Sequence, residues 1–278
     1  MCLAVSAIGL GAAGQFASRV TLVEVYATVV DEQGSLVEGL PQDAFVVEED
    51  GRPQEVRAFA NGDEPLSLAV AVDRSFSMSR ERLTRVVYAT QRMLGELRPA
   101  DRVMMLAIGS EVEVLSPLSN DHRAAYDAIA NLQPWGTTPL FDATRSAIAA
   151  IQNTSGRRAL VLITDGAERY SAATAAEIVA FARTHDVLVY PVTLSRGGVP
   201  VLSELAAVTG ARAEVVPDIN RLPSVLSSIA GELRQQYLLG YEPSPRAGAD
   251  GEGWRRIVVR VTRPGLRVRA RAGYVPSR

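Results

Sequence analysis

The chain has 278 residues, of which 47% are hydrophobic and 22% are charged, and these values are typical of a globular protein with one or two domains. A net charge of −2 gives no overall case for nucleic acid or an anionic membrane as a partner. Cys2 is the only cysteine, and His122 and His185 are the only histidines. This excludes a disulfide-stabilised fold and zinc sites built from cysteine or histidine clusters.

Residues 1–17 are apolar but too few to cross a bilayer, which takes about 20 residues. We interpret them as a signal segment, because Ala12 and Gly14 supply the small residues expected before a cleavage site near Gln15. The basic residues that usually open a signal are missing, so either the start codon is misplaced or this is an ordinary N-terminal strand. A signal predicts an extracytoplasmic protein, periplasmic or secreted, with no transmembrane segment in the mature chain.

Alternating apolar residues at both ends of the chain predict antiparallel strands. In residues 20–62, Val23, Val25, Ala27 and Val29 share one face, and "AFVVEEDG" and "EVRAFA" follow. In residues 237–276, "QYLLGYEP", "WRRIVVRVTR" and "LRVRARAGYV" have the same period. In the last two of these, apolar residues line one face and arginines lie mostly opposite, so we expect one buried face and one wet face.

Opposite charges predict that the two terminal segments meet. Residues 20–65 hold eleven acidic residues and two arginines, a net −9, and residues 237–278 hold nine arginines and three acidic residues, a net +6. We therefore expect 20–62 and 237–276 to pack as one small antiparallel β domain. The alternatives are two independent three-stranded sheets, which are marginal on their own, and an arginine face that binds nucleic acid.

Between these segments, residues 66–236 alternate apolar strands with amphipathic helices. This order predicts an α/β domain, a doubly wound and mostly parallel sheet with helices on both faces, inserted into the β domain. The expected strands are "LSLAVAV", "DRVMMLAIG", "RRALVLITDG", "DVLVYPVTL" and "ARAEVVP", and the expected helices span about 79–97, 121–132, 139–153, 174–185, 199–209 and 219–236.

Oxygen-bearing side chains gather where two buried strands end. "DRSFS" places Asp73, Ser75 and Ser77 after one strand, and "LITDG" places Asp165 after another. Every second residue of an extended segment projects to the same side, so we expect the first three to converge. Ligands of open α/β sheets bind at the carboxyl ends of the strands. Oxygen ligands without sulfur or imidazole select Mg²⁺, with Mn²⁺ or Ca²⁺ as alternatives.

The competing interpretation is that Asp73, Ser75 and Ser77 cap a helix that starts near Ser79.

"DRSFS", the threonine of "GTTPLFDA" and the aspartate of "LITDG" resemble the metal-ion-dependent adhesion site of a von Willebrand factor type A domain. The resemblance covers about residues 66–236. The flanking segments are similar to bacterial proteins of the VWFA-related type, and the inserted arrangement resembles integrin β subunits.

This resemblance implies the roles of the site residues. Ser75 and Ser77 would bind the metal directly, Thr138 directly or through water, and Asp73 and Asp165 largely through water. The sequence departs from the family pattern at Phe76 and Thr137, where glycine is usual, and this leaves the choice between Thr137 and Thr138 open.

We predict that Phe76 and Thr137 lie on the partner-binding rim of the site. The alternative for Phe76 is packing under the loop. Glu168 is expected to be a solvated surface acid, with added charge behind the metal as the alternative.

The expected function is a non-enzymatic, metal-dependent module for adhesion or scaffolding. Hydroxyl ligands leave the cation with residual positive charge and an open position, which a partner protein's Asp or Glu carboxylate can fill. The first alternative is an intracellular subunit that engages an AAA+ ATPase, as similar domains of magnesium chelatase do. The second is a metal-dependent hydrolase, but no G-x-S-x-G motif, P-loop or D-x-D motif at the site supports it.

Overall fold

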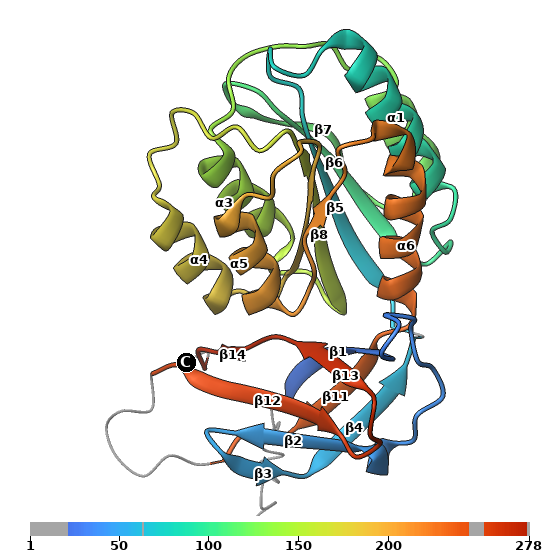
Figure 1. Ribbon diagram of the computed structural model, residues 1–278, viewed down its shortest axis with the longest axis vertical. Coiled ribbons are helices and arrows are strands. Elements are labelled where there is room, and N and C mark those ends of the chain that lie inside the picture. The colour runs from blue at the N-terminus through green and yellow to red at the C-terminus, as the bar shows by residue number, and fades with distance from the viewer. Residues whose placement is uncertain (1–21, 63, 245–252, 277–278) are drawn as a thin grey trace, which may run out of the picture.

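The computed structural model describes residues 22–62, 64–244 and 253–276, so the predicted signal segment 1–17 lies outside the described residues. It has two bodies (Figure 1). The α/β body, residues 66–234, is a sheet with helices on both faces, and the sandwich, residues 23–61 and 237–274, is made of two small antiparallel sheets. The predicted fold class is confirmed, while the domain boundaries given above stay predictions.

The sheet of the α/β body has six strands in the order β10-β9-β8-β5-β6-β7, and all neighbours except β6 and β7 pair in parallel. Its central strand β5 is buried along its whole length, which explains the unbroken apolar run in the sequence. The strands are β5 (Leu66–Asp73), β6 (Arg102–Ile108), β7 (Val112–Ser119), β8 (Arg157–Thr164), β9 (Leu188–Thr193) and β10 (Glu214–Val215).

The sequence did not predict β7. It forms a hairpin with β6 at the edge of the sheet, and its register against β6 shifts twice. Pro117, which cannot donate a backbone hydrogen bond, is tolerated here because β7 is an edge strand. An edge strand is partly exposed, so its apolar pattern is interrupted. This is why the sequence did not indicate β7.

Six helices cover the two faces of this sheet. Helices α1, α2 and α6 contribute to the apolar core on one face, and α3, α4 and α5 to the core on the other. The helices are α1 (Arg80–Leu94), α2 (His122–Ile129), α3 (Leu140–Ile151), α4 (Ala175–Thr184), α5 (Pro200–Thr209) and α6 (Leu222–Arg234), and a 3₁₀ turn, η2 (Ile219–Arg221), precedes α6. The expected helices are therefore all present.

The sandwich combines strands from both ends of the chain in each of its sheets. One sheet has the order β13-β1-β11-β4 and the other β14-β12-β2-β3. The strands are β1 (Val23–Val30), β2 (Phe45–Glu49), β3 (Arg52–Gln54), β4 (Val56–Asn61), β11 (Tyr237–Tyr241), β12 (Arg255–Val261), β13 (Arg267–Ala270) and β14 (Gly273–Tyr274), and a 3₁₀ turn, η1 (Gln42–Ala44), precedes β2.

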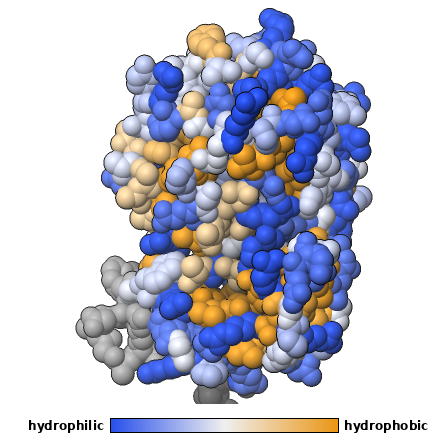
Figure 2. Space-filling model, in the orientation of Figure 1, coloured by the Kyte–Doolittle hydropathy of each residue, from blue (hydrophilic) through white to orange (hydrophobic). Residues whose placement is uncertain are grey.

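The predicted meeting of acidic and basic segments is visible in ion pairs between β12 and β2. Arg255 lies 2.7 Å from Glu49, and Arg260 binds Glu48 at 2.5 Å. Because the sandwich is small, several of its core residues stay partly exposed, among them Phe59, Val259 and Val268. Figure 2 shows an apolar area low on the molecule, where the sandwich lies.

Strand β1 illustrates how the sheet β13-β1-β11-β4 is buried on both faces. Val25, Ala27 and Val29 belong to the sandwich core, as the alternation predicted. The intervening Tyr26 belongs instead to the core of the α/β body, and so does Leu238 of β11. The sheet is therefore shared between the two bodies, which explains why its second face is not wet.

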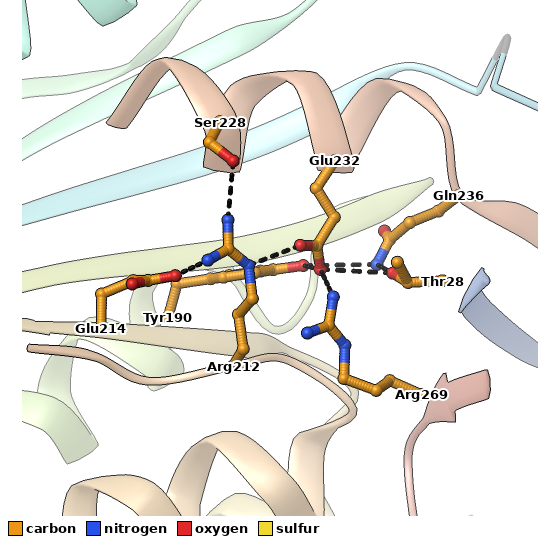
Figure 3. Close-up of polar contacts among 8 residues, drawn as sticks. All are labelled: Thr28, Tyr190, Arg212, Glu214, Ser228, Glu232, Gln236 and Arg269. Atoms are coloured by element: carbon orange, nitrogen blue, oxygen red, sulfur yellow. Dashed lines mark hydrogen bonds and ion pairs between the residues drawn. The ribbon is translucent and has the colours of Figure 1, made fainter. Parts of the chain in front are cut away.

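Polar contacts at this boundary centre on Glu232 of α6, which is 2% exposed (Figure 3). Its carboxylate accepts from Tyr190 Oη at 3.0 Å and from Arg212 Nε at 2.7 Å, both in the α/β body. From the sandwich it contacts Thr28 Oγ1 at 3.3 Å and Arg269 Nη2 at 2.8 Å. Arg269 of the C-terminal strand β13 thus binds the protein itself at this boundary.

The boundary also fixes the orientation of the α/β body. Strand β4 ends at Asn61 and β5 begins at Leu66, so the parallel strands start at the sandwich and their carboxyl ends lie at the far, upper end of the molecule (Figure 1). Within the described residues, no helix is both long enough and apolar enough to cross a membrane.

Candidate functional site

Asp73 is the last residue of β5 and is completely buried. Its Oδ1 accepts a hydrogen bond from the backbone N–H of Ser75 at 2.9 Å, and its Oδ2 accepts one from the hydroxyl of Thr164 at 2.8 Å. Thr164 ends the neighbouring strand β8, and its hydroxyl also accepts from the N–H of Gly166. Asp73 therefore ties together the ends of the two central strands.

Ser75 and Ser77 converge, although not for the reason predicted. The segment after Asp73 is not extended, because the N–H of Met78 donates to the carbonyl of Ser75 at 2.9 Å and closes a turn. The hydroxyl oxygens of Ser75 and Ser77 nevertheless lie 2.9 Å apart. Met78 is fully buried and anchors the turn in the core beneath the site.

The helix-capping interpretation is wrong for these two serines. The N-cap of α1 is Ser79, whose hydroxyl accepts from the N–H of Arg82 at 3.2 Å. The hydroxyls of Ser75 and Ser77 bond each other instead. The site therefore keeps two hydroxyl oxygens that the helix does not use.

The loop before α3 is joined to this turn by backbone hydrogen bonds. The N–H of Phe76 donates to the carbonyl of Gly136 at 3.1 Å, and the N–H of Trp135 donates to the carbonyl of Arg74 at 2.6 Å. Gly136 has a φ of +81°, and a Cβ there would lie 2.3 Å from the backbone nitrogen of Ser110. Glycine is required at Gly136 rather than at the two positions that depart from the family pattern, since neither Phe76 nor Thr137 has a positive φ.

Thr138 is 2% exposed and lies between this loop and the loop after β8. Its carbonyl accepts from the N–H of Leu140 and from the N–H of Arg169, both at 2.8 Å. Thr137 is half-buried, and its N–H donates to Ser110 Oγ at 3.3 Å. The structure thus places both threonines beside the site, and their roles as ligand and rim residue stay predictions.

Asp165 follows β8, and its Oδ1 accepts from the N–H of Ala167 at 3.0 Å. It lies close enough to Asp73 for its charge to act there. Burial raises the pKa of Asp73, hydrogen bonds from Ser75 and Thr164 lower it, and the charge of Asp165 raises it further. The two predicted carboxylates are therefore neighbours at the carboxyl ends of β5 and β8, where the strand order reverses.

Glu168 is not a solvated surface acid. Its carboxylate accepts from the N–H of Phe141 at 3.1 Å, in the first turn of α3, and from both the N–H and the hydroxyl of Ser171 at 2.9 Å. In return, Asp142 of α3 accepts from the N–H groups of Ala172 and Ala173. Glu168 therefore fastens the loop after β8 to the start of α3.

Sequence reasoning missed Thr164, which holds Asp73, and Arg74, which borders the site. Thr164 precedes Asp165 in "LITDG", but its contact with Asp73 depends on the register of β5 against β8, in which Val72 faces Ile163. The guanidinium of Arg74 binds Glu113 at 2.6 Å and lies 5.1 Å from the centre of the Trp135 ring. No sequence pattern indicates either contact.

The donor set fits a hard cation. The hydroxyls of Ser75 and Ser77 are neighbours that hydrogen-bond each other at 2.9 Å, and hydroxyl and carboxylate oxygens are the ligand type that Mg²⁺ prefers. Among the described residues, neither Asp73 nor Asp165 has an ion-pair partner, although buried carboxylates are usually paired or bound to metal. No cluster of three His, Cys, Asp or Glu side chains suited to a metal occurs in the described part of the chain.

Large aromatic side chains are exposed around the site. Phe76 is 73% exposed, Trp135 45% and Tyr170 80%. All three belong to the loops that the hydrogen bonds above join together. The alternative in which Phe76 packs under its loop is therefore wrong, and its rim role stays a prediction.

The two histidines lie at helix ends. His122 begins α2, and its Nε2 lies 2.8 Å from the carbonyl oxygen of Asp101. His185 is the C-cap of α4, and its Nδ1 lies 2.7 Å from the carbonyl oxygen of Phe181. Both are held by backbone groups of their own surroundings rather than by the site.

The central part of the chain matches a known family model. Residues 68–168 match the family model described as von Willebrand factor type A domain. This span includes all five predicted metal-site residues. No curated protein matches the chain in sequence.

Solved structures extend the similarity of the fold. A von Willebrand factor type A structure from Catenulispora acidiphila is 12% identical, with a TM-score of 0.55 over 91% of this chain and 73% of the other. The PilB minor pilin of Streptococcus sanguinis is 14% identical, with a TM-score of 0.51 over 66% of this chain and 64% of the other. The von Willebrand factor domain of a type V pilus tip protein from Porphyromonas gingivalis is 11% identical, with a TM-score of 0.50 over 60% of this chain and 94% of the other.

Proposed function

We propose, from the premise that this chain contains a von Willebrand factor type A domain, that it is a non-enzymatic module that binds another protein through a divalent cation. Asp73, Ser75, Ser77, Thr138 and Asp165 would hold the cation, with Mg²⁺ as the resident ion and Mn²⁺ or Ca²⁺ as substitutes. The cation would supply an open position for a carboxylate of the partner.

The observation that carries this proposal is the burial of the Asp73 carboxylate without a compensating positive charge. Its carboxylate is completely buried, lies near the charge of Asp165 and has no ion-pair partner among the described residues. A cation bound by Ser75 and Ser77 would compensate this negative charge. Two hydroxyl ligands would leave much of the cation's own charge available to an anion from outside.

The surroundings of the site favour a macromolecular partner. Exposed Phe76, Trp135 and Tyr170 present large rigid side chains next to the proposed cation. Aromatic side chains are enriched among the residues that dominate protein–protein binding energy. A role in adhesion or scaffolding is also supported by the pilus proteins among the structures with this fold.

The proposal includes an extracytoplasmic location. The signal-like residues 1–17 support it, and so do the pilin and the pilus tip protein with the same fold. Recovery of the protein from the cytoplasm in a complex with an ATPase would contradict this location and favour the assembly-subunit alternative.

Binding of Mn²⁺, followed by the loss of its free electron paramagnetic resonance signal, tests the site directly. We expect one bound ion in the native protein, at least about tenfold weaker binding in Ser75→Ala and Asp165→Asn, and competition by Mg²⁺. Asp121→Asn is the matched control, because Asp121 accepts from the N–H of Ala124 at 3.0 Å as the N-cap of α2. Equal binding by all four proteins would refute the proposed site.

A further inference from the structure

A groove adjoins Asp165 at the carboxyl ends of β8 and β9. One part, with a volume of about 630 Å³, is lined by Arg82, Asp165, Leu194, Arg196, Val199 and Pro217. A second part of about 240 Å³ shares Arg82, Leu194 and Pro217 with the first. The two parts adjoin at these shared residues, and together their linings include a predicted metal residue, Asp165, and residues of the first turns of α1.

The groove contains two arginines with no ion-pair partner among the described residues, Arg82 and Arg196. The third arginine, Arg85, is held by Asn220 Oδ1 at 2.7 Å and by Glu81 at 3.7 Å. Of the lining carboxylates, Glu81 is thus paired with Arg85, and Asp165 is assigned to the cation. Arg82 and Arg196 are the charges that remain for a ligand.

We propose that this groove binds an acidic, extended segment of the partner protein. The inference rests on the proposed function, because one carboxylate of the segment would bind the cation beside Asp165. Further carboxylates of the same segment would then pair with Arg82 and Arg196. Apolar side chains would contact the wall formed by Leu194, Val199 and Pro217.

The shape and chemistry of the groove favour a polypeptide over a small anion. The two arginines come from different elements, α1 and the loop after β9, and apolar residues line the same groove. An extended chain advances about 3.3 Å per residue and turns alternate side chains to one side. It can therefore present several carboxylates along the groove, whereas a single phosphate would occupy only one point.

Fluorescence anisotropy with two labelled peptides of about twelve residues tests the proposal. In one peptide Glu alternates with Gly, and in the other Gln replaces each Glu. In Mg²⁺ we expect the native protein to bind the Glu peptide at least about tenfold more tightly than the Gln peptide. The double variant Arg82→Gln/Arg196→Gln is expected to lose about five- to tenfold of this affinity, as two exposed ion pairs predict.

The matched control is Arg92→Gln, an exposed arginine at the other end of α1 and outside the groove. We expect it to bind the Glu peptide like the native protein. The double variant should also lose less affinity than the native protein when salt is raised to about 0.3 M, because fewer ion pairs remain to be screened.

The metal and the arginines are tested separately. If EDTA and Ser75→Ala leave Glu-peptide binding unchanged while the double arginine variant weakens it, the groove stands and the metal-dependent function fails. If metal dependence persists and the double variant binds normally, the groove inference is overturned and the function stands. Equal binding of the two peptides, binding of neither, or complete displacement by inorganic phosphate at matched ionic strength also overturns the groove inference.

Discussion

Arg269 of the sandwich lies 2.8 Å from Glu232 of α6, across the boundary between the two bodies. The same carboxylate binds Arg212, whose side chain, like that of Arg269, is largely buried at 24% and 29% exposure. Burial of Tyr190, and then the charge of Glu232, raise the pKa of the Tyr190 hydroxyl, so that it stays a proton donor to the carboxylate. The side chain of Glu232 therefore joins strand β13 to the core of the α/β body.

We expect Glu232→Gln to destabilise the protein by about 3 kcal/mol, because Arg269 would lose its ion-pair partner at the buried boundary, while Arg212 would keep Glu214. Urea unfolding measures this free energy. The control is Glu204→Gln, which removes an exposed pair with Arg183 at 3.5 Å and should change stability by less than about 1 kcal/mol. Equal losses in the two variants would show that the boundary does not depend on Glu232.

Ser77→Ala and Ser79→Ala should affect different properties, Mn²⁺ binding in the first variant and stability in the second. Ser79 is the N-cap of α1, so its loss should lower the free energy of unfolding by about 1 kcal/mol and leave Mn²⁺ affinity unchanged. Ser77 is exposed and bonds Ser75, so its loss should weaken Mn²⁺ binding with a stability change within about 0.5 kcal/mol. Stability is measured in EDTA, and a metal defect in Ser79→Ala would contradict the assignment of the two serines.

Gly136→Ala should weaken metal binding, because it displaces the loop beside the site. A Cβ at this position would lie 2.3 Å from the backbone nitrogen of Ser110, so the loop that bonds Phe76 must shift. We expect at least about tenfold weaker Mn²⁺ binding.

The control for this prediction is Gly34→Ala. Gly34 has a similar φ of +85° but nothing within 4 Å of its Cβ position, so only conformational strain of about 1–2 kcal/mol is expected. Normal metal binding by Gly136→Ala would mean that the loop tolerates the shift.

The sandwich should lose stability at alkaline pH. Burial, together with hydrogen bonding to the Glu49 carboxylate, raises the pKa of Tyr274 to about 12 from 10.0. A raised folded-state pKa means that the stabilisation is complete below pH 10 and is lost as pH rises toward 12.

Denaturant unfolding followed between pH 9 and about 12 measures this loss. Tyr274→Phe should be less stable than the native protein near neutral pH, because Glu49 loses the hydroxyl that donates to it at 2.8 Å. It should also show a shallower decline above pH 10. An unchanged slope in the variant would exclude Tyr274 as a contributor.

Local sequence pattern was sufficient for the fold class and for the expectation that Asp73 and Asp165 lie close together. The apolar run of β5 reflects burial on both faces of the strand. The alternation of β1 reflects the residues that it contributes to the sandwich core. Both patterns can be read from the sequence without knowing which strands lie beside β5 and β1. The carboxyl ends of parallel strands meet at one edge, so Asp73 and Asp165 were expected to be close before any contact was known.

Contacts between distant segments were beyond the reach of the sequence. Thr164 holds Asp73 only because of the register of β5 against β8, and Glu168 fastens α3 only because the loop after β8 turns back onto it. The turn that joins Ser75 to Met78 replaced the extended segment expected from alternation.

The sequence by itself determined the order of the helices and of the buried strands, although not the edge strand β7, and placed oxygen donors at two strand ends, because burial and period are local properties of the chain. The tertiary structure alone decided that Asp73, Asp165, Arg82 and Arg196 have no ion-pair partner within the described ranges, and how Glu232 joins the two bodies. These features depend on distances between residues far apart in the chain, and only packing of the whole fold fixes such distances.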